Sequence, residues 1–228
     1  AAPSSGTSGT FSGSLNATAT TDPAGIATPP VFTANDIAGQ YRVSASVSGA
    51  PQAAVDFFLT NTAGGPASVV ATFGTPQSAE VAQPFSDPFR VQVRDALTNT
   101  VPNALVRFTP PGSGPSGTFQ LGIDTVRTDS NGVAQARPFT ANTRAGARPY
   151  GLRIEVGTLV ELDLFSLTNR PGPPDSCLAE AGTPDSTQVD RPFPREKTVL
   201  VTDRYRNPRP NVVVSFFAPT SGASLSAV

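Results

Sequence analysis

Apolar and polar residues alternate in two stretches of the chain that share one pattern, residues 89–108 and 197–216. In each copy a Val-x-Val pair leads to an aspartate, and an asparagine follows four residues later. A Pro-Asn step then precedes a second alternating run that ends in phenylalanine. Alternation places the apolar side chains on one face of a strand, and Asp, Asn and Pro favour turns. Each stretch is therefore predicted to form a β-hairpin with one buried face.

An offset of about 108 residues relates further motifs along nearly the whole chain. Gly-Thr-Pro at 74–76 returns at 182–184, Ser-Gly-Thr-Phe at 8–11 returns at 116–119, and Leu-Thr-Asn at 59–61 returns at 167–169. A fixed period of this kind indicates tandem copies of one folding unit. The predicted division is the C-terminal half of a unit at 1–61, a complete unit at 62–169, and the N-terminal half of a unit at 170–228.

Short strands separated by turn-forming residues are expected throughout the complete unit. They are expected at 67–73, around Val81 as an edge strand, at 89–94, at 104–109, from Phe119, at 124–128, at 133–139, at 150–156 and at 159–167. Seven or eight such strands in roughly 100 residues are typical of an immunoglobulin-like sandwich. Almost no helix is expected, because Pro, Gly or β-branched clusters interrupt every helical period. The predicted fold class is all-β, with tandem immunoglobulin-like β-sandwich repeats of about 108 residues.

The alternating positions also predict the core between the two sheets of the complete unit. The core-facing residues are expected to be Val91, Val93, Val106, Phe108, Phe139, Tyr150, Leu152, Ile154 and Val156. Tyr41 and Tyr150, which follow an Ala-Gly step in each unit, are expected to make a hydrogen bond like that of a tyrosine corner rather than to contact a ligand.

Composition narrows the chemistry that the chain can carry. The sequence has no histidine, no methionine and one cysteine, so histidine-activated nucleophiles, histidine metal sites and thiolate clusters are excluded. Glu155, Glu161 and Asp163 are interpreted as solvent-facing strand residues rather than as a catalytic carboxylate pair. We therefore expect no enzymatic activity and no cofactor.

Two isolated positions leave alternatives open. The turn at 129–132 is rich in oxygen ligands, which makes Asp129 and Asn131 a weak candidate for calcium binding beside the favoured interpretation of a plain turn. Cys177 is expected to be a small buried hydrophobic residue, with an intermolecular crosslink or a reactive thiol as the alternatives.

Charge and hydropathy exclude two classes of partner. The net charge of −1 argues against nucleic acid or an anionic membrane surface as the main partner, because both need a basic excess. The basic window at 191–209 is interpreted as a solvated surface. The sequence contains no apolar run of the roughly 18 residues that a membrane-spanning helix needs.

Taken together, the ordered motifs resemble bacterial immunoglobulin-like repeats of the invasin and intimin type. The motifs are Val-x-Val-x-Asp with its following Asn and Pro, Gly-Pro-Ser-Gly-Thr-Phe at 114–119, Thr-Asp-x-x-Gly-x-Ala at 128–134, Phe-Thr-Ala-Asn-Thr at 139–143 and Ala-Gly-x-x-x-Tyr at 145–150. The resemblance covers the complete unit and both halves, although the Pro-rich loops depart from it. It implies tandem sandwich domains in surface or secreted proteins, which form adhesin stalks or fibres without enzymatic activity.

The leading functional prediction is a non-enzymatic structural repeat of an extracellular or bacterial cell-surface protein. Pro-rich junctions such as 170–174 would hold successive sandwiches in line as a stalk, with neighbouring repeats or other copies as partners. One alternative is an adhesion module that recognises a host protein or glycan through sandwich-end loops such as 110–117. Another is a filament subunit in which the half unit 170–228 is completed by the half unit 1–61 of the next molecule. An arbitrary cut through a longer chain would equally produce two half units.

Overall fold

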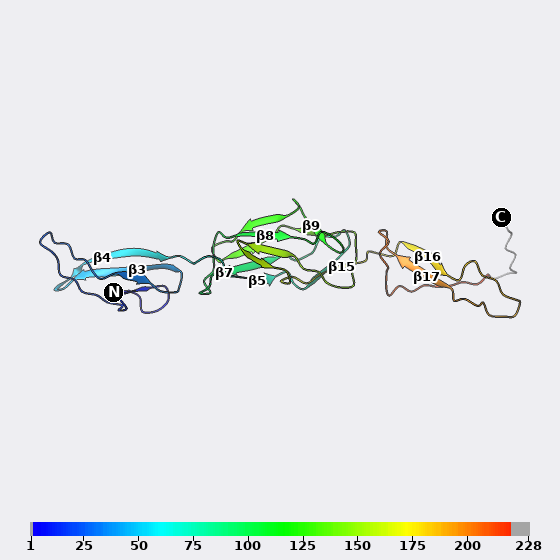
Figure 1. Cartoon of the computed structure of the whole chain (residues 1–228), viewed down its shortest axis with the longest axis horizontal. Coiled ribbons are helices and arrows are strands. Elements are labelled where there is room, and N and C mark those ends of the chain that lie inside the picture. The colour runs from blue at the N-terminus through cyan, green and yellow to red at the C-terminus, as the bar shows by residue number, and fades with distance from the viewer. Residues whose placement is uncertain (1, 220–228) are drawn as a thin grey trace.

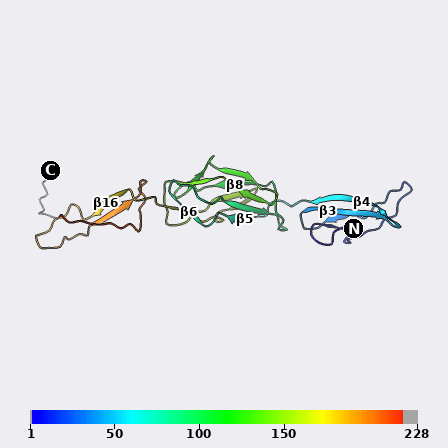
Figure 2. The ribbon, with the colours of Figure 1, turned by 180° about the vertical axis from the view of Figure 1, so that it is seen from behind.

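The computed structural model describes residues 2–219. All regular secondary structure in that range is β-strand. The all-β prediction is confirmed for these residues. Figure 1 shows three groups of strands that follow one another along a single long axis, and the view from behind shows the same arrangement (Figure 2). We call them the N-terminal segment (2–61), the central segment (62–169) and the C-terminal segment (170–219). The outermost residues of the two predicted half units, 1 and 220–228, lie outside the described residues.

Eleven strands start in the central segment. They are β5 (Ser68–Phe73), β6 (Gln77–Glu80), β7 (Arg90–Arg94), β8 (Leu105–Thr109), β9 (Gly117–Phe119), β10 (Asp124–Arg127), β11 (Val133–Gln135), β12 (Phe139–Ala141), β13 (Arg153–Val156), β14 (Leu159–Glu161) and β15 (Leu167–Arg170). One sheet has the order β10-β8-β13-β14 and another has the order β11-β7-β5. The pair β12-β9 is antiparallel, and β15 runs parallel to β6.

The core of the central segment is built from alternate residues of these sheets. Side chains at the alternate positions of β7, β8 and β13 are buried, and those between them are exposed or half-buried. Eight of the nine residues expected in the core are at most 2% exposed: Val91, Val93, Val106, Phe108, Phe139, Leu152, Ile154 and Val156. Tyr150 is partly buried against the same cluster. Two sheets with their apolar faces packed together fit a β-sandwich.

Phe89 lies at the centre of an aromatic cluster within this core. Its ring centroid lies 5.0 Å from that of Phe165, 5.4 Å from Phe139, 6.1 Å from Phe85 and 6.3 Å from Phe119. Tilted and edge-on ring pairs at these separations add to the stability that burial alone provides.

The predicted hairpin at 89–108 is wrong, because β7 and β8 belong to different sheets. The chain does turn back after β7, and the Val101 N–H donates to the Val93 carbonyl at 3.0 Å. Pro102 then has no N–H to continue the pairing, and Asn103 has a positive φ of 60° that redirects the chain. The two strands share one alternating pattern because they face the same core from opposite sides.

Two long predicted strands are each divided between sheets. The expected strand 133–139 becomes β11 and β12, and the expected strand 159–167 becomes β14 and the start of β15. Between β11 and β12, the Arg137 N–H donates to the buried carboxylate of Asp124 at 2.6 Å, and Pro138 has no N–H. Phe119 ends β9 rather than opening a strand.

The flanking segments contain fewer strands. The N-terminal segment has β1 (Gly9–Phe11), β2 (Phe32–Ala34), β3 (Gly39–Val47) and β4 (Ala50–Asn61), paired as β1-β2 and β3-β4. The C-terminal segment has β16 (Ser176–Ala181) paired with β17 (Thr198–Thr202). The register of this last pair repeats that of β5 and β7 in the central segment. Val69 lies opposite Val93, and Cys177 lies opposite Val201.

The prediction that Cys177 is buried is wrong, because this side chain is exposed. Val69, its counterpart in the central segment, is only 4% exposed because a second sheet covers it. No second sheet covers β16 and β17 among residues 170–219. Burial at this position therefore depends on an opposing layer rather than on the residue type.

Replacing Phe108 by alanine is expected to destabilise the central segment by about 3–5 kcal/mol, since it removes a fully buried ring and leaves a cavity. Urea denaturation followed by far-UV circular dichroism measures the change. Leu105→Ala on the same strand is the control. Leu105 is 50% exposed, so its loss should cost well under about 1 kcal/mol. Equal effects of the two changes would contradict the two-layer packing.

Candidate functional site

The first junction, between the N-terminal and central segments, is organised by Asp95, which directly follows β7. Its Oδ1 accepts hydrogen bonds from the N–H groups of Leu97 (2.9 Å) and Asn99 (2.8 Å), which close the turn. Its Oδ2 accepts from the N–H of Gly64 at 2.9 Å. Gly64 lies in the linker that follows β4, so one buried carboxylate ties the turn to the linker.

Asn99 extends this contact into the N-terminal segment. Its Nδ2 donates to the carbonyl of Asp36 at 2.8 Å, and its Oδ1 accepts from the N–H of Ala38 at 2.9 Å. The amide also donates to the Asp95 carboxylate at 3.0 Å. A primary amide can donate and accept at once, so this side chain satisfies two backbone groups that are distant in sequence.

Asn61, the last residue of β4, holds the same loop from the N-terminal side. Its Nδ2 lies 2.8 Å from the carbonyl of Ser8, 3.0 Å from Oδ1 of Asn35 and 3.2 Å from the carbonyl of Ile37. Only 8% of Asn61 is exposed. The loop that receives Asn99 is therefore fixed on both sides.

The second junction, between the central and C-terminal segments, has the same geometry. Oδ2 of Asp203 accepts from the N–H of Gly172 at 2.9 Å. Asn207 donates to the carbonyl of Thr143 at 2.9 Å and accepts from the N–H of Ala145 at 2.9 Å. Gly172 follows its counterpart Gly64 by 108 residues, and Thr143 and Ala145 follow Asp36 and Ala38 by 107 residues.

Asn169 takes the place of Asn61 at the second junction. Its Nδ2 lies 2.8 Å from the carbonyl of Ser116, 3.0 Å from Oδ1 of Asn142 and 3.1 Å from the carbonyl of Arg144. The hydroxyl of Tyr150 donates to Oδ1 of Asn169 at 2.8 Å, and burial raises the pKa of that hydroxyl. The partner of Tyr150 is thus a side chain of the junction rather than the upstream backbone group of a tyrosine corner.

The loop and linker around the second junction are also anchored. Asn142 donates its Nδ2 to the carbonyl of Gly114 at 2.9 Å, which ties the Pro-rich loop 110–117 to the same asparagine cluster. Arg209 donates to the carbonyl of Pro171 at 2.7 Å in the linker 170–174. The three prolines of that linker each fix φ, so few rotations remain free.

The hydrogen bonds of both junctions keep the aspartates ionised. The bond from the Asn99 side chain, together with that from the Gly64 N–H, lowers the pKa of Asp95 below its usual value of 3.8 despite burial. For Asp203, burial raises the pKa, but the bonds from Asn207 and Gly172 outweigh it and the net change is a lower pKa.

The other candidate residues take no part in the hydrogen bonds of the junctions. Oδ1 of Asp129 accepts from the N–H groups of Asn131 (2.8 Å) and Val133 (2.9 Å), so it closes the turn between β10 and β11. No group of three or more acidic or cysteine ligands occurs within residues 2–219, and calcium binding at this turn stays a prediction. Glu155 forms ion pairs with Arg107 and Arg153, while Glu161 and Asp163 are exposed.

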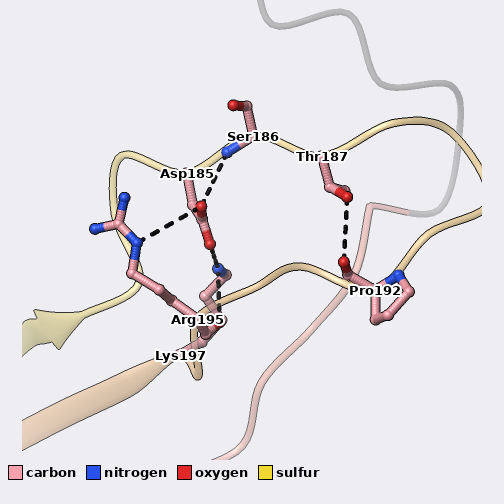
Figure 3. Close-up of polar contacts among 6 residues, drawn as sticks. All are labelled: Asp185, Ser186, Thr187, Pro192, Arg195 and Lys197. Carbon is pink, nitrogen blue, oxygen red and sulfur yellow. Dashed lines mark hydrogen bonds and ion pairs between the residues drawn. The ribbon is translucent and has the colours of Figure 1, made fainter.

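The basic window of the C-terminal segment contains an ion-pair cluster (Figure 3). The ammonium of Lys197 lies 2.6 Å from Oδ2 of Asp185, and the guanidinium of Arg195 lies 3.8 Å from Oδ1 of the same carboxylate. The ammonium also lies 4.5 Å from the ring centroid of Phe193. Lys197 stands where the central segment has Phe89, so a cation replaces the central ring of the aromatic cluster.

Sequence reasoning found Asp95, Asn99 and their second copies but interpreted them as turn formers only. It missed Asn61 and Asn169 as contributors to the same site. The signal available in the sequence was that Asp95, Asn99 and Asn61 each recur 108 residues later as the same residue type. Several residue types can close a turn, so recurrence of the same types indicated a further role.

Among solved structures, the chain is similar to FdeC, described as a broadly conserved Escherichia coli adhesin that elicits protection against urinary tract infections. The two are 17% identical with a TM-score of 0.48. The alignment covers 79% of this chain and 55% of that chain, so this chain spans about half the length of the adhesin. No protein-family model and no curated protein matches the sequence. Residues 2–219 include no helix long and apolar enough to cross a membrane.

Acidification is expected to loosen both junctions. The folded pKa values of Asp95 and Asp203 lie below the usual value of 3.8, so the ionised carboxylates stabilise the junctions above that pH. This stabilisation is lost as the pH falls through the folded values. Small-angle X-ray scattering from about pH 6 to about pH 2 should show a shorter, more variable particle at the acidic end.

The double variant Asp95→Asn/Asp203→Asn is the control for this titration. It lacks both carboxylates, so its maximum dimension should already be reduced at neutral pH and should change less on acidification. Identical profiles for the parent and the variant would show that these aspartates do not hold the junctions.

Chelator is expected to leave the melting temperature unchanged, because Oδ1 of Asp129 already accepts two backbone N–H groups and few further ligands are at hand. Differential scanning calorimetry with EDTA, and then with excess calcium, measures this. A rise of several degrees with calcium that Asp129→Ala abolishes would instead establish a calcium site at the turn 129–132.

Proposed function

We propose that this chain is a stiff, non-enzymatic spacer built from tandem immunoglobulin-like repeats, and that it extends a stalk on a bacterial cell surface. The observation that carries the proposal is the hydrogen-bond network that occurs at both junctions with the same residue types and nearly the same distances. A network of this kind fixes the orientation of one segment on the next.

The linkers support the proposal because hydrogen bonds hold each of them in place. A flexible linker leaves successive domains free to rotate, and relative motion is the usual expectation where the interface between domains is small. Here the N–H of Gly64 donates to Asp95, and the N–H of Gly172 donates to Asp203. Each linker is therefore held by the turn of the following segment, while Asn99 or Asn207 holds the loop of the preceding one.

The aspartate and asparagine side chains at the junctions suit a contact that holds a fixed orientation. Asparagine and aspartate are short, so fixing them costs little side-chain entropy compared with lysine, arginine or glutamate. Most of their bonds are made to backbone groups of the linkers and loops. Hydrogen bonds from backbone N–H groups to a carboxylate are also stronger than those between neutral groups.

Equal geometry at two junctions gives the chain a regular axis. Identical contacts repeated along a chain produce the same rotation and translation at every step. The three segments do lie in line in Figure 1. Additional repeats with the same Asp and Asn residues would lengthen this axis in the same direction, which is what a stalk requires.

The double variant Asn99→Ala/Asn207→Ala tests this function. It removes the bonds to Asp36, Ala38, Thr143 and Ala145 but leaves the backbone N–H bonds to the two aspartates. Small-angle X-ray scattering of the parent should give a narrow distance distribution with a long maximum dimension. The variant should give a broader distribution with a reduced mean length and an unchanged content of β-structure.

Asn131→Ala is the matched control, because Asn131 is an exposed turn asparagine whose side chain takes no part in the hydrogen bonds of either junction. Its scattering profile should equal that of the parent. A double variant that remains as extended as the parent would remove the basis for a stiff spacer.

A further inference from the structure

The chain enters and leaves the central segment at opposite ends. It enters through the linker in which Gly64 is bound to Asp95, and it leaves through β15 and the linker in which Gly172 is bound to Asp203. The three segments follow one long axis (Figure 1). Tension along that axis would therefore reach the central segment through its first and last strands. The inference below rests on the proposed function, because a spacer within a stalk is exposed to such tension.

The strands at the two ends run in the same direction along the axis. β7 ends beside Asp95 at the first junction, and β5 is antiparallel to β7, so β5 runs away from that junction. β15 ends at the linker 170–174, so it runs toward the second junction. β6 follows β5 in the chain and is parallel to β15, so it also runs toward the second junction.

This arrangement loads the pair β6-β15 in shear. Tension pulls β6 by its N-terminal end toward the first junction and β15 by its C-terminal end toward the second. The two strands can separate only by sliding past each other, and the bonds of a parallel ladder are evenly spaced, so all of them carry force together. Strands that are pulled apart from one shared end would instead lose their bonds one at a time.

Hydrogen bonds hold the pair at both of its ends. The Gln77 N–H donates to the carbonyl of Ser166 at 3.1 Å, and the Val81 N–H donates to the carbonyl of Arg170 at 2.9 Å. The N–H of Ser166 donates to the hydroxyl of Thr75 at 2.8 Å, which extends the contact beyond the start of β6.

Alternate side chains of this pair are anchored in the core. Ala79 and Val81 are 6% and 3% exposed, and Leu167 and Asn169 are fully buried. Water therefore has little access to the ladder from the core side, and hydrogen bonds are stronger where water is excluded. Asn169 is also held by the asparagine cluster of the second junction.

We propose that residues 75–81 and 166–170 form a tension clamp, which sets the force at which the central segment unfolds. Residues 82–165 lie between the two halves of the clamp in the chain, so tension cannot extend them until the clamp opens. Loss of β5 from β7 frees the chain only as far as β6. On the other side, β15 is further tied to the body of the segment by the paired bonds of Leu167 with Tyr150, at 2.8 and 2.9 Å.

Atomic-force pulling of the 228-residue chain by its two ends tests the proposal. Opening of the clamp should release the central segment in one event of roughly 30–35 nm, since an extended chain spans at most about 3.3–3.6 Å per residue. Each flanking segment can release only about 20 nm on the same basis. The length of the event therefore identifies the central segment.

Two variants weaken the clamp. Val81→Pro removes the N–H that donates to Arg170, and Thr75→Val removes the acceptor of the Ser166 N–H. Each should lower the force of the central event by about a third or more, because forced unfolding follows the unfolding rate and the pair has few bonds to share the load. Circular dichroism checks the fold of both. Should Val81→Pro fail to fold, Thr75→Val, which is close to isosteric, decides alone.

Val126→Pro is the matched control. Val126 lies opposite Val106 on β10, which ends its sheet and belongs to the stretch between the two halves of the clamp. The Thr128 N–H donates to the carbonyl of Ala104, so by antiparallel alternation the N–H of Val126 also bonds to β8. The control thus removes one ladder bond outside the path of the force. It should lower stability in urea but leave the force of the central event close to that of the parent.

Two outcomes would overturn the clamp. In one, force falls in step with urea stability in all three variants, which means that the whole core resists tension. In the other, the parent shows no central event above the noise of the instrument. Both leave the stiff spacer intact, because scattering of Asn99→Ala/Asn207→Ala tests the junctions separately. That double variant keeps the clamp, so its central event should occur at the force of the parent.

Discussion

A β-sheet with one apolar face is stable only when another layer covers that face, and this requirement governs the whole chain. In the central segment β7 and β8 supply facing layers, and the valines and phenylalanines between them are fully buried. In the flanking segments the same alternation of residues continues, but residues 2–61 form only the pairs β1-β2 and β3-β4, and residues 170–219 form only the pair β16-β17. Phe57 and Phe216 are therefore exposed, although the residues at the matching positions of the central segment are buried in its core. The difference between the segments lies in what covers them rather than in their sequence pattern.

The junctions solve a separate problem, which is to join one segment to the next without leaving backbone groups unsatisfied. A strand that ends at the edge of a sheet leaves N–H and C=O groups that need partners. Asp95 and Asp203 accept the N–H groups of the turn and of the linker, while Asn99 and Asn207 satisfy both a carbonyl and an N–H of the preceding segment. These four side chains join the segments through directed hydrogen bonds rather than through a large apolar interface. Orientation is thus set by polar groups at positions where apolar burial is limited.

The sequence predicted which side chains are buried more reliably than it predicted which strands pair. Alternation identified the inward-facing residues of β7, β8 and β13, because the period of side-chain direction is local. It could not show that β7 and β8 face each other across the core, since strands in one sheet and strands in two facing sheets carry the same pattern. The change of sheet depends on Pro102 and Asn103, where the prediction saw only a turn. The partner of Asn99 lies in the loop around Asp36, and no local pattern reports a contact over that distance in sequence. Cys177 was misjudged for the same reason, because its exposure depends on a layer outside its own strand.

The C-terminal segment shows which parts of the fold depend on one another. Its apolar face is open, yet Asp203 is only 2% exposed, and β16 pairs with β17 in the register of β5 and β7. The junction therefore needs only one sheet and its turn, and it does not need a complete sandwich. The polar junction and the apolar packing are thus separate interactions, because the first forms at a segment whose apolar residues are still exposed.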